Sequence, residues 1–177
     1  PLSLIRGYAE TIRDVSGNVP EKREKQLDII IEESERLSKI VDDILNLSQM
    51  QAGYLNLNPG RFIINKTVED AVKRYDILSE KTGIKIIFEN PGDIMVTADE
   101  PRIEQVLYNL INNAFNHTPE GGSITVKVID GQHTVRVEVS DTGTGISDED
   151  IRHVWDRYYK ADKTNRRKMA GTGLGLA

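Results

Sequence analysis

The chain has 177 residues, of which 38% are hydrophobic and 29% are charged, so it holds enough apolar material for a folded core. It contains no cysteine, which excludes disulfides and thiolate metal sites. The net charge of −5 argues against nonspecific nucleic-acid binding, because such binding needs many cations to neutralise phosphates. No apolar run approaches the length needed to cross a bilayer.

The spacing of apolar residues in the first part of the chain predicts a helical hairpin. Apolar residues recur at helical spacing from Leu2 to Ile12, and residues 16–20 then interrupt the pattern. A second helix over about residues 21–51 carries an a/d heptad for roughly three repeats. Its members are Leu27, Ile30, Ser34, Leu37, Val41, Ile44 and Ser48, and Ile31, Ile40 and Leu45 widen the stripe. Because one hairpin cannot cover such a stripe, we predict that residues 1–53 form a four-helix bundle with a second copy. A hairpin packed on its own domain is the alternative.

Residues 54–177 predict an α+β domain. Strands are expected at residues 61–64, 84–88, 94–97, 123–129 and 134–140. The last two strands form a hairpin across Asp130-Gly131. One helix is expected over residues 66–81 with Asn65 as its cap, and another runs from the cap Asp99 to His117. Because strands and helices mix without regular βαβ alternation, the fold class is α+β.

The predicted helix 103–117 carries amide side chains along one flank: Gln105, Asn109, Asn112, Asn113 and Asn116. Asparagine is a poor helix former, because its side chain competes for backbone hydrogen bonds, so this accumulation costs stability. An amide oxygen is a neutral hard ligand, suited to a Mg²⁺ ion that already carries phosphate oxygens and waters. A solvated polar face explains this helix alone equally well.

A second candidate site follows the last predicted strand. Asp141 ends the strand, and Gly143 and Gly145 follow at a spacing of two. A carboxylate here can accept a hydrogen bond from an exocyclic amine, and the glycines allow the backbone to approach a flat ring. A plain turn at a strand end is the alternative interpretation.

A third candidate site is the glycine-rich loop near the end of the chain. Gly171, Gly173 and Gly175 precede an apolar stretch, a pattern suited to a loop that enters a helix and offers N–H groups to phosphates. The polar and basic residues 163–168 lie just before it and suit a flexible lid over a triphosphate. A solvated run of charges is the alternative.

In order and spacing, these motifs resemble the conserved boxes of the sensor histidine kinase family. Residues 109–114 resemble the N box, 141–145 the G1 box, 154–162 the F box and 171–176 the G2 box. Residues 1–5 are similar to the segment that follows the family's phospho-accepting histidine. The resemblance therefore covers essentially the whole chain.

The resemblance implies a dimerisation and phosphoacceptor hairpin at residues 1–53 and an ATP-binding α/β sandwich, a mixed sheet packed on helices, at residues 54–177. It implies ATP and Mg²⁺ as cofactors, with Asn113 as the metal ligand and Asn109 as its neighbour. Asp141 would receive the adenine amino group in a pocket lined by Gly143 and Gly145. Further nucleotide contacts are implied for Asn116, His117, Lys160, Lys163, Arg166, Gly171, Thr172, Gly173, Leu174 and Gly175.

Several positions need a separate interpretation. Arg157 of the F box either stabilises the transferred phosphate or forms a structural ion pair. Asn116 stands where the family often has Lys or Arg, so a phosphate-binding cation is missing. Lys163, Arg166 or His117 would be its substitute, and the sequence does not choose among them. Trp155 and Asp156 replace the usual Phe and Glu, and we expect Trp155 to anchor the base of the lid.

The histidines of the chain are His117, His133 and His153, and none lies in the predicted hairpin. We therefore expect the acceptor histidine to lie a few residues before Pro1, and the chain as written to bind ATP without phosphorylating itself. We expect the helix after the G2 loop to continue beyond Ala177. The resemblance implies a bacterial parent protein, membrane-anchored upstream, with this portion in the cytoplasm.

The implied reaction is transfer of the γ-phosphoryl group of Mg·ATP to a histidine on the first helix, and then to an aspartate of a response regulator. Catalysis would come from positioning and charge neutralisation. ATP hydrolysis is disfavoured, because related ATPases have a glutamate base where this chain has Asn109, and an amide cannot accept a proton from water. Glu104 lies a further helical turn away. A non-catalytic dimeric scaffold or a response-regulator phosphatase module that binds nucleotide is the alternative.

Overall fold

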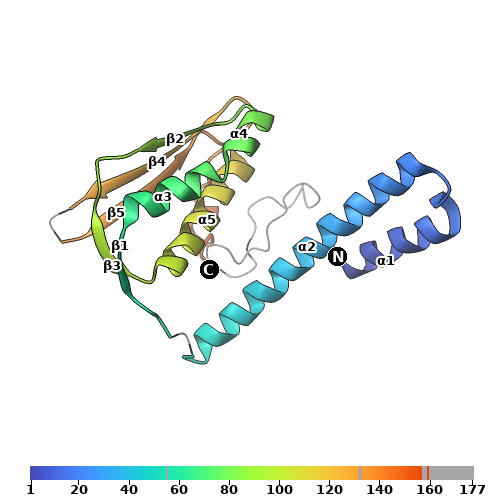
Figure 1. Ribbon diagram of the computed structural model, residues 1–177, viewed down its shortest axis with the longest axis horizontal. Helices are drawn as coiled ribbons and strands as arrows, with labels where there is room; N and C mark the ends of the chain where they lie inside the picture. Colours follow the sequence, from blue (N-terminus) through green and yellow to red (C-terminus); the bar gives the residue numbers. More distant parts are fainter. Residues whose placement is uncertain (55, 132, 157–158, 160–177) are drawn as a thin grey trace. The chain divides into compact units, whose positions relative to one another are not determined.

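Figure 1 shows the computed structural model, which describes residues 1–54, 56–131, 133–156 and 159. The chain divides into two compact units, Pro1–Leu55 (unit 1) and Asn56–Ala177 (unit 2). A membrane-spanning helix would need a long apolar stretch, and no helix in the described part of the chain has one.

Unit 1 is the predicted helical hairpin. Helix α1 (Leu2–Thr11) passes through a short π-helical turn, η1 (Ile12–Ser16), and α2 (Pro20–Gln51) returns along it. The buried hydroxyl of Ser16 fastens the turn by donating to the Thr11 carbonyl at 3.2 Å and to the side-chain oxygen of Gln26. The predicted pair of helices and the interruption between them are confirmed.

The heptad stripe of α2 is largely exposed in the single chain. No residue of α2 is fully buried. Leu27, Val41 and Ile44 of the predicted seam are 42%, 47% and 45% exposed, and the flanking Ile31 and Leu45 are each 55% exposed. Packing of α1 on α2 therefore covers only part of the apolar surface that the sequence provides.

The strands described in unit 2 form two small sheets. In the first, β1 (Gly60–Ile63) pairs antiparallel with β3 (Met95–Ala98). In the second, the strand order is β2-β4-β5. Strand β2 (Lys85–Glu89) runs parallel to β4 (Ser123–Asp130), and β4 pairs antiparallel with β5 (Val135–Asp141). The predicted β4–β5 hairpin is confirmed, whereas the strands on either side of the turn at residues 90–92 belong to different sheets.

In the described part of unit 2 the helices are α3 (Ile64–Lys73), α4 (Asp76–Thr82) and α5 (Glu100–His117), and a 3₁₀ turn, η2 (Asp150–Arg152), follows. The helix predicted over residues 66–81 is thus divided into α3 and α4. Helix α5 begins and ends where the sequence predicts. The carboxylate of Asp99 caps it by accepting a hydrogen bond from the Arg102 N–H at 3.2 Å.

The prediction that Asn65 caps a helix is wrong. Asn65 lies in the first turn of α3 and is only 1% exposed. Its side-chain nitrogen donates to the Asn90 side-chain oxygen at 2.8 Å, and its oxygen accepts from the Ile94 N–H at 2.9 Å. The amide fastens α3 to the connection between β2 and β3, because those partners, rather than the N–H groups of its own helix, are within its reach.

The core of unit 2 lies between the sheet β2-β4-β5 and the helices α3 and α5, which cover one face of it (Figure 1). Val68 of α3, Ile111 of α5 and Ile124 of β4 are completely buried there. At one side the ring of Tyr75 stacks on Phe115 with centroids 4.9 Å apart, and burial raises the pKa of its hydroxyl. This core is a mixed sheet packed on helices, as the family resemblance implies, and it fixes the rotation of α5.

Candidate functional site

The amide flank of α5 is displaced from the core. Leu107, Ile111 and Ala114 are buried, while Asn109 and Asn113, one helical turn apart, are both half-buried. Among the residues that the structure describes, neither of these two amides has a hydrogen-bond partner. Half-buried amides without protein partners are suited to a polar ligand or a hydrated cation, as the sequence analysis expects.

The DxGxG turn lies against the C-terminal end of the same helix. Asp141 is the last residue of β5, and its Oδ1 accepts a hydrogen bond from the Gly143 N–H at 2.8 Å. A Cβ added to Gly143 would lie 2.4 Å from the carbonyl oxygen of His117, the last residue of α5. Gly145 has a φ of 70°, in the left-handed region that favours glycine. The fold therefore brings two of the predicted motifs into one place.

A pair of hydrogen bonds that the sequence analysis missed holds this turn. The Thr142 N–H donates to the Ser123 carbonyl at 3.0 Å, and the Ser123 N–H donates to the Thr142 hydroxyl at 2.9 Å. Gly122 lies underneath, where an added Cβ would be 2.5 Å from Thr118 Cγ2 and 2.9 Å from Thr142 Oγ1. The sequence signal was a threonine beside the aspartate together with a double glycine before β4.

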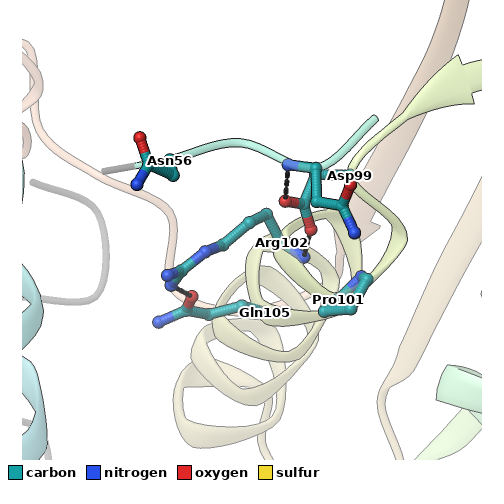
Figure 2. Close-up of a pocket in the computed structure, with 6 residues that line it drawn as sticks. Asn56, Asp99, Pro101, Arg102 and Gln105 are labelled. Carbon is teal, nitrogen blue, oxygen red and sulfur yellow. Dashed lines mark hydrogen bonds between the residues drawn. The ribbon is translucent and has the colours of Figure 1, made fainter. Parts of the chain in front are cut away.

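A shallow hollow of about 460 Å³ opens at the N-terminal end of α5 (Figure 2). Asp99 joins its walls, because its Oδ2 accepts a hydrogen bond from the Asn58 N–H at 2.8 Å while its Oδ1 caps α5. Nη1 of Arg102 donates to the Gln105 side-chain oxygen at 3.0 Å. Gln105 lies one helical turn before Asn109, so the hollow lies at the start of the amide flank. The hollow is lined by Asn56, Asn58, Asp99, Pro101, Arg102 and Gln105.

Comparison with known proteins agrees with both units. Residues 1–53 match the family model of the His Kinase A (phospho-acceptor) domain, and residues 98–177 match that of the histidine kinase-, DNA gyrase B- and HSP90-like ATPases. The catalytic domain of histidine kinase ThkA is 30% identical, with 69% of this chain and 76% of that chain covered and a TM-score of 0.59. The chain belongs to the sensor histidine kinase family.

Two further relatives extend the match to nearly the whole chain. Sensor protein SrrB of Staphylococcus aureus (strain MRSA252) is 34% identical over 176 residues, which are 99% of this chain. The chain spans 30% of the length of SrrB. Histidine kinase ThkA in complex with response regulator protein TrrA has a TM-score of 0.74 at 29% identity, covering 90% of this chain and 47% of that one. The fold is therefore that of histidine kinases, with a helical hairpin followed by the ATPase-type domain.

The start of the kinase family's F box is held differently from the prediction. Trp155 is 66% exposed, so the expectation that it anchors the segment is wrong. Instead, the Tyr159 hydroxyl donates to Asp150, and its ring lies 5.4 Å, between centroids, from that of His153. The hydrogen bond to Asp150 raises the pKa of the Tyr159 hydroxyl. Asp150 is itself fixed by the Ser147 hydroxyl at 2.6 Å, so a polar cluster replaces the expected apolar contact.

The structure places only part of the predicted site. Asn109, Asn113, His117, Asp141 and Gly143 lie on α5 and the adjoining turn. Asn116 is also on α5 and is exposed, and Gly145 is in the turn. The remaining predicted residues lie outside the described part of the chain: Arg157, Lys160, Lys163, Arg166, Gly171, Thr172, Gly173, Leu174 and Gly175.

Proposed function

We propose that this chain is the core of a sensor histidine kinase that binds Mg·ATP in unit 2 and transfers the γ-phosphoryl group to a histidine of the first helix of the hairpin. Residues 1–53 would be the dimerisation and phosphoacceptor part, and residues 54–177 the ATP-binding catalytic domain. One observation carries the proposal: the DxGxG turn is packed against the end of the amide helix, with Gly143 in contact range of the His117 carbonyl. Two polar motifs that are distant in the sequence thus lie next to each other at the C-terminal end of α5.

In this proposal the purine binds at the turn. Asp141 accepts a hydrogen bond from the adenine amino group through Oδ2, which has no partner among the described residues, while Oδ1 is held by the Gly143 N–H. Gly143 and Gly145, which lack side chains, leave the backbone open to the ring. The carboxylate acceptor favours adenine over purines that carry an oxygen in place of that amine.

The phosphates would extend along the amide flank. Asn113 offers a neutral oxygen to Mg²⁺ and Asn109 lies one turn before it, and both fit a hydrated metal–phosphate group because they are half-buried and lack protein partners among the described residues. Bound Mg²⁺ would neutralise charge on the phosphate oxygens. The protein's part is to orient the nucleotide and exclude water, which is how phosphoryl transfer is mostly catalysed. The cations and glycines of the F and G2 boxes are assigned to the phosphates by resemblance alone.

The ion pair of Glu104 supports transfer to histidine over ATP hydrolysis. Glu104 is the nearest carboxylate on α5 before Asn109, and it forms an ion pair at 3.1 Å with Arg74, the residue that follows α3. Five residues along a helix turn a side chain by about 140°, so Glu104 and Asn109 point to different sides of α5. A general base must reach the attacking water, and Asn109 cannot serve because it is an amide.

The exposed stripe of α2 supports assembly as a homodimer. Leu27, Val41 and Ile44 remain more than 40% exposed in the single chain, and a second hairpin would cover them in a four-helix bundle. ThkA was solved with the response regulator TrrA, and we extend such a partner, a receiver domain with an acceptor aspartate, to this chain. By the same resemblance the parent protein would be membrane-anchored, with this portion in the cytoplasm. A dimeric nucleotide-binding scaffold or phosphatase module is the second candidate.

Calorimetry tests nucleotide binding directly. The unmutated chain should bind ATP in the presence of Mg²⁺, and Asp141→Asn should weaken binding about tenfold or more, because an amide can offer the adenine amine a donor instead of an acceptor. Asp130→Asn is the matched control, since it makes the same chemical change at the exposed opposite end of the β4–β5 hairpin and should have no effect. Absence of ATP binding by the folded, unmutated chain would refute the proposal.

Phosphoryl transfer is tested in the same chain carrying the upstream segment with the acceptor histidine. Labelled phosphate should pass from ATP to that histidine and then to a receiver domain. ATP binding without any labelling would favour the scaffold or phosphatase module.

A further inference from the structure

We propose that Thr142 is a positioning residue that sets the purine selectivity of this site by fixing the direction of the Asp141 carboxylate, and that Gly122 is needed for it to do so. The inference rests on the proposed function, because it concerns the same nucleotide pocket. Neither residue belongs to the set expected to contact nucleotide. We infer their role from the hydrogen bond between Thr142 and Ser123 and from the closeness of Gly122 to the Thr142 hydroxyl.

The Thr142 hydroxyl takes the place of a backbone carbonyl at the end of the sheet. The last ladder pair of β4 and β5 is Ile124 with Asp141, so Ser123 and Thr142 are the next opposing residues. The Thr142 N–H still reaches the Ser123 carbonyl at 3.0 Å, as in a regular ladder. The Ser123 N–H, however, donates at 2.9 Å to the Thr142 hydroxyl. The Thr142 side chain thus supplies the second hydrogen bond of this pair of residues. The Thr142 carbonyl is not needed for it, so the backbone can turn away from the strand.

Because the chain leaves the strand at Thr142, only one carboxylate oxygen of Asp141 remains available to a ligand. The chain turns back so that the Gly143 N–H donates to Oδ1 of Asp141 at 2.8 Å. One carboxylate oxygen is thereby occupied, and the side chain is held in a single orientation with Oδ2 available. A fixed acceptor discriminates between an amine and an oxygen on a purine better than a freely rotating one, because a rotated carboxylate can let water bridge to either group.

Because Gly122 has no side chain, it leaves space for the Thr142 side chain to reach the Ser123 N–H. A Cβ at this position would lie 2.9 Å from Thr142 Oγ1, 2.5 Å from Thr118 Cγ2 and 3.0 Å from the Pro119 carbonyl oxygen. Threonine is β-branched and has few alternative rotamers, so these atoms cannot easily move aside. Gly121 is different: its φ is 78°, but nothing lies within 4 Å of an added Cβ. An alanine at Gly121 strains the backbone, whereas one at Gly122 pushes on Thr142.

The test compares the affinities of the full chain for ATP and inosine triphosphate, whose purine has a carbonyl oxygen and an N1–H in place of the amine and the bare N1 of adenine. Thr142→Val keeps the shape of the side chain but removes the acceptor for the Ser123 N–H. It should lower the ratio of ATP to inosine triphosphate affinity by about fivefold to tenfold. Thr142→Ser restores the hydroxyl and should restore the ratio. Thr125→Val, the same change on β4 two rungs away, should leave the ratio unaltered.

The two glycines separate positioning from a general loss of stability. Gly122→Ala should reduce the affinity ratio as Thr142→Val does, while Gly121→Ala should lower the melting temperature without changing the ratio. This comparison also decides the matter if Thr142→Val does not fold. An unchanged ratio in Gly122→Ala, or an equal fall in both glycine variants, would overturn the inference and leave the proposed function intact. Absence of ATP binding by the unmutated chain would overturn both.

Discussion

The two units of this chain are specified in different ways. Among the described residues, unit 2 buries thirteen hydrophobic side chains in a core between sheet and helices, whereas Ser16 is the one buried residue of unit 1. Yet α2 of unit 1 is the longest helix, with 32 residues and an apolar stripe along it. A long amphipathic helix owes most of its stability to tertiary packing of its apolar face. Unit 2 therefore contains the packing partners of its own helices, whereas the hairpin of unit 1 leaves much of the apolar stripe of α2 uncovered.

The largest effect should come from the core of unit 2. Ile111 is completely buried on α5, and Ile111→Ala should lower the free energy of unfolding of unit 2 by about 3 kcal/mol, through lost apolar burial and the cavity left behind. Denaturant unfolding followed by circular dichroism measures it. Val106→Ala on the same helix removes a side chain that is 53% exposed and should change the free energy by less than about 0.5 kcal/mol. Equal losses in the two variants would mean that the core is not where the structure places it.

In the hairpin, by contrast, we expect an exposed apolar side chain to matter, through dimerisation rather than through the stability of unit 2. Ile44→Asp puts a charge on the exposed stripe of α2, so it should raise the dissociation constant of the dimer by about 100-fold, or about 2.7 kcal/mol. Unfolding of unit 2 should be unaffected. Sedimentation equilibrium measures the dimer, and Asp42→Ala on the exposed face of α2 is the control. If the unmutated chain is monomeric at millimolar concentration, the contrast between the units needs another explanation.

The same contrast separates what local sequence predicts from what it does not. The bounds of α5, its cap Asp99 and the β4–β5 hairpin follow from patterns within a few residues, and all were predicted. Asn65 looked like a cap because a polar residue precedes an apolar helical pattern, but its partners are Asn90 and Ile94, far along the chain. The role of such a side chain depends on its burial and on partners that are distant in the sequence, and local periodicity carries information about neither.

The candidate site shows the same division. The sequence identified the residues expected to face a ligand, since amides in a helix and glycines after a strand are unusual enough to notice. It missed Thr142, whose hydrogen bonds depend on the register that sets it opposite Ser123. It also misjudged the F-box aromatics: Trp155 is exposed, and Tyr159 is held by Asp150 through a polar contact that hydrophobicity does not predict.

The smallest expected effect is on the attachment of the first residues of unit 2 to its core. The Asp99 carboxylate caps α5 through one oxygen and holds the Asn58 N–H through the other. Asp99→Asn keeps one oxygen for the cap but places an amide NH₂ group, which is a donor, opposite the Asn58 N–H. It should therefore cost only about 0.5–1 kcal/mol in unfolding free energy and speed hydrogen exchange at the Asn58 amide several-fold.

Two further variants identify which bond is responsible. Asp99→Ala removes both hydrogen bonds and should cost more, about 1–2 kcal/mol, with faster exchange at the Arg102 amide as well. Asn58→Ala keeps its backbone N–H, so exchange there should stay slow, because the side chain takes no part in the bond. Slow exchange at Asn58 in the Asp99→Asn variant would show that the segment is held by the core without this carboxylate. Unit 2 would then begin at Asn56 through packing alone, and the polar junction at the start of α5 would be dispensable.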